Sequence, residues 1–387
     1  MLEKARSLHT QMITWRRDFH MHPELGFHEE RTAAKVAEIL KACGCRVRSG
    51  VGKTGVVAEL GEGKPIIAIR ADMDALPVPE ANDVPYKSLN EGLMHACGHD
   101  AHTAMLLGTA ALLSKEKLPG TVRFLFQPSE EMEDEEGISG APRMVADGAM
   151  QDVDCVIALH VYSGTETGMI ELSHGNSAAG VDTFYGKVIG QGGHGSTPHK
   201  VIDPIFISGH VILALHSIVG RRLWPFDPAV ISIGSIQGGH IDNVIPESVE
   251  MSGTIRYLEE DVQQQLHSEI ERAFELAKTL GGDYELKIQI GYPPMKNNPK
   301  VADLIAAVVE DILGPERLQV PRPEMGAEDF GFFMQKAPGA MFYLGCRIEG
   351  DERRHHDPRF DVDEECLPVG VAVFAETVMR FLSNPQI

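Results

Sequence analysis

The chain has 387 residues, 43% of them hydrophobic, which favours two domains with full apolar cores. Subtracting 56 acidic from 35 basic residues gives −21, a charge that repels phosphate backbones and anionic lipids and argues against nucleic acid and membrane partners. The start of the chain lacks the continuous apolar segment of a secretory signal, and the six scattered cysteines do not suggest a disulfide framework. We therefore expect a cytoplasmic location.

In the N-terminal part of the chain, helical and strand-like patterns alternate. Apolar residues recur there at helical spacing or in short continuous runs. We expect helices at 3–22, 29–43 and 98–114, and strands at 55–60, 66–70, 121–126 and 155–159. This alternation predicts an α/β domain with a central mixed sheet flanked by helices.

The pattern changes at residue 182, where strand, helix, strand, strand, helix and strand follow one another. The expected segments are 182–190, 202–222, 229–237, 247–258, 259–280 and 283–292. The β-α-β-β-α-β order is that of a ferredoxin-like unit. Because such a unit is self-contained, we expect an inserted domain at 182–293 within a discontinuous first domain at 1–181 and 294–387.

The densest chemical signal is the segment HACGHDAH at 95–102. Cys97 and His99 lie two residues apart where a loop enters a predicted helix, and a thiolate and an imidazole suit a borderline-soft divalent metal. A second signal is FQPSEE at 126–131, which ends a buried strand in two adjacent carboxylates. Adjacent residues point to different sides, so one carboxylate can bind a metal while its neighbour faces an attacking water.

Three further polar segments lie at strand ends or in loops, where α/β folds place their sites. His160 in ALHV ends an apolar strand, Asp72 and Asp74 in IRADMDALP end another, and RRHHDPRFD at 353–361 forms a polar loop late in the chain. A lone histidine at a strand end also suits a hydrogen-bonded core residue, so each segment alone is ambiguous. Their combination in one domain indicates an active site.

Taken together, these segments make the chain resemble the co-catalytic metal amidohydrolases and peptidases, a family that includes aminoacylase, hippurate hydrolase, indoleacetyl-amino-acid hydrolase and carboxypeptidase G-type enzymes. The family's motifs occur in the family's order along nearly the whole chain, as WRRDFHMHPELGFHEERT, IRADMDALP, HACGHDAHT, FQPSEE, GGHGSTPH, NVIPESVEMSGTIR, GAEDF and the histidine-rich loop. HACGHD marks the amidohydrolase branch, in which a cysteine replaces the bridging aspartate of the peptidase branch.

The resemblance implies a catalytic domain that binds two divalent metal ions per subunit, of zinc, manganese, cobalt or nickel. Their implied ligands are Cys97 as the bridge, His99, Glu131, His160 and His356. Glu130 is then the general base and acid, and Asp74 orients a ligating imidazole. Asp72, at the position of a histidine ligand in the peptidase branch, is expected to lie behind the ligands, and His355 has no assigned role.

For the inserted domain, the resemblance implies a lid and dimerisation role. His194 in GGHGSTPH is expected to donate to the oxyanion in the partner subunit's site, which implies a homodimer or a higher oligomer. Asn243 and Arg256 are the expected substrate-binding residues, and a guanidinium fork suits the α-carboxylate of an N-acyl amino acid. A hinge is expected near residues 180 and 294, with Gly180 as a pivot.

One segment departs from the family's pattern. After FQPSEE the chain reads MEDEEGISGAPRM, which adds four carboxylates at 133–136. They form a solvated loop or, as a hypothesis, they repel anionic acyl groups and favour neutral or cationic substrates.

The sequence thus predicts a metal-dependent amidohydrolase that cleaves N-acyl amino acids or similar small amides, with a metallo-dipeptidase or aminopeptidase of the same family as the alternative. A third class, a hydrolase with Cys97 as nucleophile or a metal-free binding protein, stays open. The chain has no GxSxG elbow, Walker loop or dinucleotide fingerprint, so serine hydrolase, NTPase and dehydrogenase functions have no support.

Overall fold

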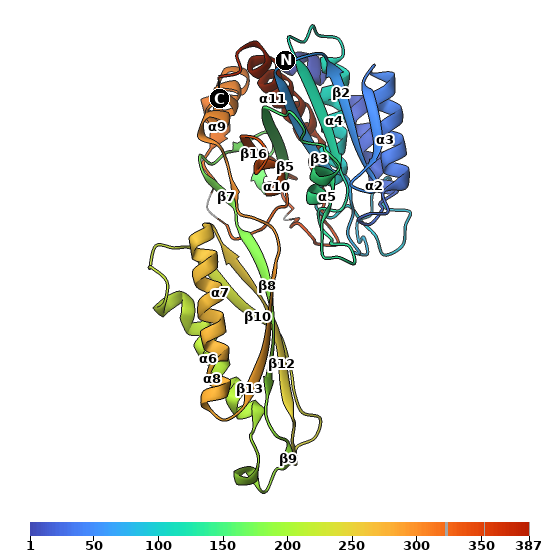
Figure 1. Cartoon of the computed structure of the whole chain (residues 1–387). Coiled ribbons are helices and arrows are strands. Elements are labelled where there is room, and N and C mark those ends of the chain that lie inside the picture. Colours follow the sequence, from blue (N-terminus) through green and yellow to red (C-terminus); the bar gives the residue numbers. More distant parts are fainter. Residues whose placement is uncertain (322–323, 352, 387) are drawn as a thin grey trace. The chain divides into compact units, whose positions relative to one another are not determined.

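The computed structural model describes residues 1–321, 324–351 and 353–386. The chain forms two compact units, which Figure 1 shows: unit 1 is Met1–Ser177, Lys296–Arg322 and Asp329–Ile387, and unit 2 is Ala178–Met295 and Pro323–Glu328. The expected divisions after residues 181 and 293 lie close to these bounds. The sequence does not predict that the short stretch after residue 322 belongs to unit 2.

Unit 1 is built on an eight-stranded sheet with the order β1-β2-β4-β3-β5-β16-β6-β15. The strands are β1 Arg46–Val51, β2 Gly55–Gly61, β3 Ile66–Asp72, β4 Thr121–Gln127, β5 Cys155–Glu166, β6 Ile170–Glu171, β15 Leu318–Gln319 and β16 Gly339–Arg347. The central strands β4, β3, β5 and β16 run parallel, and the antiparallel pairs lie outside them. The predicted α/β domain with a mixed sheet is confirmed.

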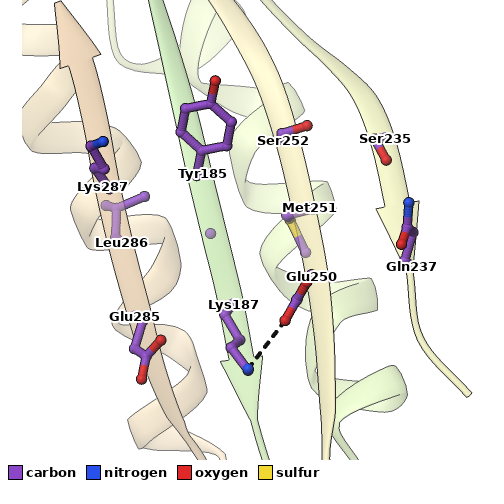
Figure 2. A pocket seen from close by; sticks show the side chains of 11 residues that line it. Tyr185, Lys187, Ser235, Gln237, Glu250, Met251, Ser252, Glu285, Leu286 and Lys287 are labelled. Carbon is purple, nitrogen blue, oxygen red and sulfur yellow. Dashed lines mark ion pairs between the residues drawn. The ribbon is translucent and has the colours of Figure 1, made fainter. Parts of the chain in front are cut away.

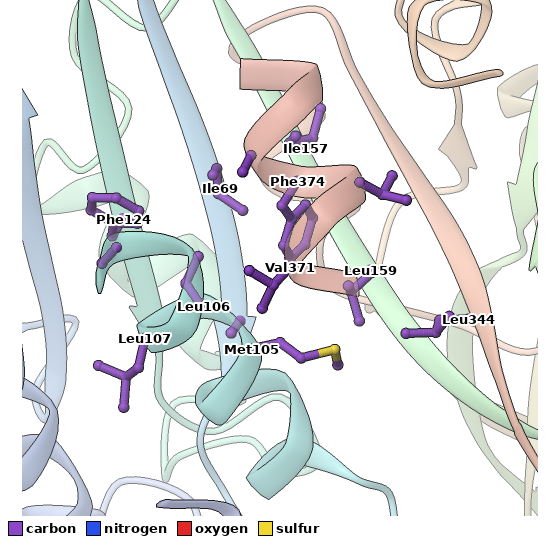
Figure 3. Packing of buried hydrophobic residues seen from close by; sticks show 14 of the residues in the cluster. Ile69, Met105, Leu106, Leu107, Phe124, Ile157, Leu159, Leu344, Val371 and Phe374 are labelled. Atoms are coloured by element: carbon purple, nitrogen blue, oxygen red, sulfur yellow. The ribbon is translucent and has the colours of Figure 1, made fainter. Parts of the chain in front are cut away.

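The two faces of this sheet differ because side chains alternate along each strand. On one face, Ile69 and Ile157 pack with Val371 of a covering helix in the main core, as Figure 3 shows. On the other face, the same strands carry Arg70 and His160. Polar side chains therefore enter the interior of unit 1 beside the parallel strands without interrupting its apolar core.

The helices of unit 1 are α1 Leu2–Arg6, α2 His9–Met21, α3 Glu30–Ala42, α4 His99–Leu113, α5 Gly140–Ala146, α9 Pro299–Leu313, α10 Gly331–Met334 and α11 Leu367–Ser383. Helices α3, α4 and α11 contribute to the main core, whereas α5 and α10 contact each other. The expected helix at 3–22 is divided in two. Helix α4 is buried along almost its whole length, which explains its nearly continuous apolar sequence.

Unit 2 has the predicted β-α-β-β-α-β order. Its elements are β8 Gly180–Ile189, α6 Pro204–Arg221, β10 Ala229–Gln237, β12 Ser248–Tyr257, α7 Glu260–Phe274 followed by α8 Leu276–Thr279, and β13 Asp283–Ile290. The sheet order β10-β12-β8-β13 is antiparallel throughout, as in a ferredoxin-like unit. The remaining short strands are β7 Asn176–Ala178, β9 Gly193–His194, β11 Val244–Ile245 and β14 Met295–Lys296.

The core of unit 2 lies between its sheet and the helices α6 and α7. Phe184 and Phe274 meet edge to face there, with ring centroids 6.3 Å apart. A Cβ on Gly180 would lie 2.4 Å from the Tyr257 ring, so close packing explains this glycine. Its role as a pivot stays a prediction.

A groove of about 470 Å³ lies over strands β8, β10, β12 and β13 of unit 2, as Figure 2 shows. Lys187 and Glu250 form an ion pair of 3.1 Å within it. The groove contains none of the predicted site residues. The predicted active site therefore does not lie in this groove.

Two helical segments, Pro204–Arg221 and Glu364–Ser383, have the length and hydropathy of a membrane span. Most of the second is buried inside unit 1, where it includes the core helix α11, whereas much of α6 in unit 2 is exposed. Helices of this kind also occur in the cores of soluble proteins, so length and hydropathy do not identify a span here.

Candidate metal centre

His99 is the first residue of α4 and Cys97 lies two residues before it, and both are buried. Between them, Gly98 has a φ of 94°, and a Cβ there would lie 2.4 Å from Val161 Cγ2 on β5. Only glycine combines this left-handed backbone with so close an approach. The turn thereby brings both side chains against the strand that carries His160.

The structure brings all five predicted ligands together. The ligand atoms of Cys97, His99 and His160 are within 4.8 Å of one another, and so are those of Cys97, Glu131 and His356. Cys97 belongs to both groups, which is the arrangement expected of a thiolate shared by two ions. The five side chains come from the start of α4, the loop after β4, strand β5 and the C-terminal loop.

Hydrogen bonds fix the tautomers of two histidines in these groups. His99 Nδ1 donates to the carbonyl oxygen of Asp74 at 3.0 Å, and His160 Nδ1 donates to the carbonyl oxygen of Val161 at 2.7 Å. Carbonyl oxygens only accept, so each Nδ1 carries the proton. Nε2 is then the nitrogen of each ring that can present a lone pair to a metal ion, as in ligating histidines.

Two buried ligand atoms lack a hydrogen bond among the described residues. His99 Nε2 is one, and the other is Glu131 Oε1, which has an ion-pair contact of 3.2 Å with His356 Nε2. Buried polar atoms are rarely left in this state. Thiolate, imidazole and carboxylate donors suit zinc and similar divalent metals. The residues present therefore fit the predicted ions.

Asp74 connects the two groups of ligands. Its Oδ1 accepts a hydrogen bond from His99 Nδ1 at 3.1 Å, and its Oδ2 accepts the backbone N–H of Glu131 at 2.9 Å. One carboxylate thus orients an imidazole of the first group and the backbone of a carboxylate of the second. These are the contacts of a residue that orients metal ligands.

His102, the last histidine of HACGHDAH, has a structural role that sequence reasoning missed. Its Nδ1 donates to Asp72 Oδ1 at 2.6 Å and its Nε2 accepts the N–H of Val161 at 2.9 Å. Both ring nitrogens are occupied, so His102 is not a ligand although it lies close to His99. Asp72 also accepts from Arg70 at 2.6 Å, behind the ligands. The available signal was the three-residue spacing from His99, which places both rings on one face of α4.

The carboxylates around the ligands favour positive charge in the pocket. Burial by itself lowers the pKa of His99, but the charges of Asp72, Asp74 and Glu131 outweigh it and raise that pKa to about 10. Burial and the charge of Glu131 raise the pKa of the Cys97 thiol well above its usual range. Divalent cations would supply the positive charge that these groups otherwise obtain from protons.

The cysteine-nucleophile alternative depends on Cys97 and His160, whose Sγ and Nε2 atoms lie 3.5 Å apart. A catalytic thiol needs a lowered pKa. Here the pKa of the thiol is raised, and burial lowers the pKa of His160 to about 4, so the pair stays neutral. His355 lies 3.8 Å from the sulfur, but its Nε2 accepts the N–H of Ser163 and its ring stacks on Tyr162. These contacts argue against thiol catalysis.

Glu130 is buried beside the ligands. Its carboxylate lies within 4.8 Å of the ligand atoms of His99 and Glu131. It belongs to neither group that contains Cys97. This position suits a base that handles a proton next to the ions without being one of their main ligands.

The C-terminal loop presents His356 with an unusual backbone. Its φ of 64° lies in the left-handed region, and its N–H donates to the carbonyl oxygen of Ala96 at 2.8 Å. Arg16, which is fully buried, donates to Asp100 at 2.8 Å and to Asp361 at 2.6 Å. These ion pairs hold the loop to the HACGHD segment and maintain the strained ligand position.

Two of the three predicted residues of unit 2 lie side by side. Strand β9, which carries His194, pairs with β11, and the carbonyl oxygen of Asn243 accepts the N–H of Gly195 at 2.8 Å. His194 is exposed, and its Nδ1 accepts the N–H of Ser196 at 3.1 Å. Its Nε2 then carries the proton and can donate, as an oxyanion donor must.

Arg256 lies at the other end of the same sheet. Arg256 pairs with Val181 of β8, and it lies eight residues (256 − 248) after Ser248, the first residue of β12. At 3.4 Å per residue, about 27 Å separate these two positions of β12, and His194 lies beyond the Ser248 end. Arg256 is partly buried, and its Nε donates to Thr254 Oγ1 at 3.0 Å. Within one chain, His194 and Arg256 therefore cannot contact the same small substrate.

The acidic loop at 133–136 is less charged than its sequence suggests. Asp134 pairs with Lys53 at 2.6 Å and with Arg143 at 2.7 Å, and Glu136 pairs with the same arginine at 2.7 Å. Asp134 also accepts the N–H of Glu136 and thereby shapes the turn. Two of the four carboxylates, Asp134 and Glu136, are therefore neutralised, which weakens the hypothesis of anion repulsion.

Comparison with known proteins covers nearly the whole chain. The sequence profile of peptidase family M20/M25/M40 matches residues 68–380. Thermostable carboxypeptidase 2 of Saccharolobus solfataricus is 41% identical over 98% of this chain and 99% of its own. N-acetyl-L-cysteine deacetylase of Bacillus subtilis is 37% identical over 98% of this chain and 90% of its own. The crystal structure of a dinuclear metal-binding peptidase of family M20 from Bacillus subtilis aligns with a TM-score of 0.85 at 33% identity, covering 98% of this chain and 99% of that chain.

Proposed function

The chain belongs to peptidase family M20/M25/M40 and is a metal-dependent amidohydrolase. We propose that it uses two divalent ions to hydrolyse the amide bond of N-acyl amino acids or similar small amides. The observation that carries this proposal is the membership of Cys97 in two adjacent groups of ligands, with Glu130 beside them. The name of the related N-acetyl-L-cysteine deacetylase supports the substrate class.

When bound, zinc, manganese, cobalt or nickel ions would polarise the scissile carbonyl and make water more acidic. In this proposal Glu130 accepts the proton of the attacking water and later gives it to the departing amine. His99 and His160 hold one side of the site, and Glu131 and His356 hold the other. Fixed tautomers and a buried base keep these groups in place before the substrate arrives.

Unit 2 supplies the groups that bind the substrate in this proposal. His194 Nε2 donates to the developing oxyanion, a contact worth roughly 3–4 kcal/mol. Asn243 and Arg256 bind the substrate, with the guanidinium on the α-carboxylate. The separation of His194 and Arg256 within one chain supports the idea that His194 acts in the partner subunit's site.

A homodimer, or a higher oligomer built from it, is part of the proposal because unit 2 exposes large apolar side chains. On α6, Phe206 and Leu213 are 58% and 71% exposed, and Trp224 and Phe226 after this helix are 64% and 77% exposed. Strand β10 is an edge of the sheet. Exposed apolar groups beside an open sheet edge are typical of an interface between subunits.

We also place the protein in the cytoplasm, without nucleic acid or membrane partners. All six cysteines are free thiols, as expected in a reducing compartment. The net charge of −21 repels phosphate backbones and anionic lipids.

Elemental analysis, combined with a panel of N-acyl amino acids, tests the proposal. We expect about two ions per chain, as in two-metal hydrolases, and hydrolysis of at least one N-acyl amino acid. Dialysis against a chelator should abolish activity, and zinc or manganese should restore it. Activity that survives complete removal of metal would overturn the proposal.

A metallo-dipeptidase or aminopeptidase of the same family is the second candidate, and the 41% identity to thermostable carboxypeptidase 2 supports peptidase activity in general. Comparing hippurate with an unblocked dipeptide separates the two. A much higher kcat/KM for hippurate supports the amidohydrolase, and the reverse order supports the peptidase. Cys97, in place of the aspartate of the peptidase branch, favours the first outcome.

A further inference from the structure

The loop after β4 carries Glu130 and Glu131, and its geometry depends on a residue outside the predicted site. Ser129, directly before these carboxylates, is buried and has a φ of 45°. Residues other than glycine seldom adopt this left-handed conformation. Such a backbone persists only where the surrounding structure holds it.

Three hydrogen bonds hold Ser129. Its N–H donates to Glu29 Oε1 at 2.8 Å, its carbonyl oxygen accepts the N–H of Gly140 at 2.8 Å, and its hydroxyl donates to the carbonyl oxygen of Met132 at 2.8 Å. Glu29 is the one partner of the three that contributes a side chain. It therefore joins the loop to an N-terminal segment of the chain.

Glu29 is itself held in place at the start of α3. It is fully buried, and its second carboxylate oxygen accepts a hydrogen bond from Thr54 Oγ1. The backbone of Gly26, three residues earlier, also packs against the loop, because a Cβ there would lie 2.2 Å from Ser129 Oγ. The segment that carries Glu29 is thus packed directly against Ser129.

The carboxylates of Glu29 and Asp74 hold the loop on both sides of Glu130. Glu29 accepts the N–H of Ser129, and Asp74 accepts the N–H of Glu131 at 2.9 Å, so Glu130 lies between two fixed peptide groups. We propose that Glu29 is a positioning residue that sets the direction of the Glu130 carboxylate. This inference rests on the proposed function, in which Glu130 transfers the proton.

Glu29→Ala tests the inference, because it leaves the buried N–H of Ser129 without its acceptor. We expect kcat for an N-acyl amino acid to fall on the order of 10²-fold, as when a catalytic group moves by about 1 Å, with little change in KM. Glu29→Gln should restore most of the activity, because an amide oxygen can accept from Ser129 while the amide group bonds Thr54. If Glu29→Ala does not fold, Thr54→Val removes only the second anchor and should cause a smaller fall in kcat.

Glu24→Ala is the matched control. Glu24 also holds the start of α3, by accepting the N–H groups of Arg31 at 3.0 Å and Thr32 at 2.8 Å. We expect this variant to lose thermal stability while its kcat stays unchanged. An equal loss of kcat in both variants would show that Glu29 acts only through the stability of α3, and would overturn the inference.

Hydrogen exchange of the metal-free protein gives a readout that does not depend on turnover. In Glu29→Ala, the peptide that spans 127–132 should exchange faster than in wild type. Unchanged exchange, or an unchanged kcat, would overturn the positioning role. If the wild-type protein hydrolyses no amide, the proposed function fails, and the exchange rates still decide whether Glu29 holds the loop.

Discussion

The candidate residues of the two units are held in different ways. In unit 1, His99 is fully buried and its Nδ1 is bonded to Asp74, whereas in unit 2 His194 is exposed and its Nδ1 bonds locally to Ser196. A site whose ligands are locked by their neighbours is preorganised. Unit 1 can therefore hold the proposed metal ions through its own contacts, whereas in our proposal unit 2 contributes groups that act once a substrate is bound.

Replacing Cys97, the predicted ligand that both groups share, should have the largest effect on metal content and activity. Cys97→Ala removes a member of both ligand groups, so we expect both ions to be lost and activity to fall to background. Elemental analysis after gel filtration measures the metal content. His356→Ala, which disrupts one group only, is the control and should retain about one ion per chain. A Cys97→Ala protein that keeps both ions would contradict the bridging role.

Glu130→Gln should separate chemistry from metal binding within unit 1. The amide has nearly the same shape but cannot accept the proton, so we expect kcat to fall by roughly 10²–10⁴-fold. The metal content should stay that of wild type. A variant that loses metal in proportion to its activity would show that Glu130 is a ligand instead of the base.

The fold of both units could be predicted largely from periodicity, and the exceptions have physical reasons. The strand at 46–51 pairs at the sheet edge and has five of its six residues wholly or partly exposed, so it lacks an apolar run. Helices α5 and α10 are too short to show a helical repeat. Predictions thus failed where local sequence carries little burial signal.

The candidate site was predicted through motifs, and with Asp72 and Asp74 as exceptions its supporting residues were not. His102 and Glu29 act through side-chain contacts with strands and loops far away in the sequence. Ser129 lies 100 residues from Glu29 in the chain, and no local pattern reveals that bond. Ligand types follow from chemistry, but the groups that hold them follow from tertiary packing.

A third prediction tests the catalytic role proposed for unit 2. His194→Ala should lower kcat by roughly 10²–10³-fold, as expected for loss of one oxyanion donor, with both ions retained. The ions stay because every predicted ligand lies in unit 1.

Subunit mixing sharpens this prediction. If His194 acts in the partner subunit's site, Glu130→Gln and His194→Ala chains should complement each other in a mixed dimer, because one site per dimer then has both residues. Random mixing should restore up to about a quarter of the wild-type activity. No recovery after confirmed exchange of subunits would place His194 in the site of its own chain, or outside catalysis.

The smallest expected effect is on how the unfolding free energy depends on pH, and this dependence has opposite signs in the two units. In unit 1, burial and then the charge of Asp74 raise the pKa of Glu29 from 4.5 to about 7. In unit 2, burial by itself raises the pKa of Asp182, but the hydrogen bonds from His267, Gln263 and Gly291 together outweigh it and lower that pKa. The stability from Asp182 is therefore present above its ordinary pKa and is lost on acidification. That from Glu29 is complete below about pH 4.5 and is lost as the pH rises through 7.

Glu29→Gln isolates the unit 1 part of this difference, because the amide stays neutral at every pH. Between pH 4.5 and 8, the metal-free wild-type protein should lose on the order of 1–3 kcal/mol of unfolding free energy that the variant keeps. Urea unfolding of both proteins across this range measures it, with Glu24→Gln as a control that should follow the wild type. Parallel curves for wild type and Glu29→Gln would mean that folding does not raise the pKa of Glu29. The raised pKa, and with it the electrostatic contrast between the two units, would then be wrong.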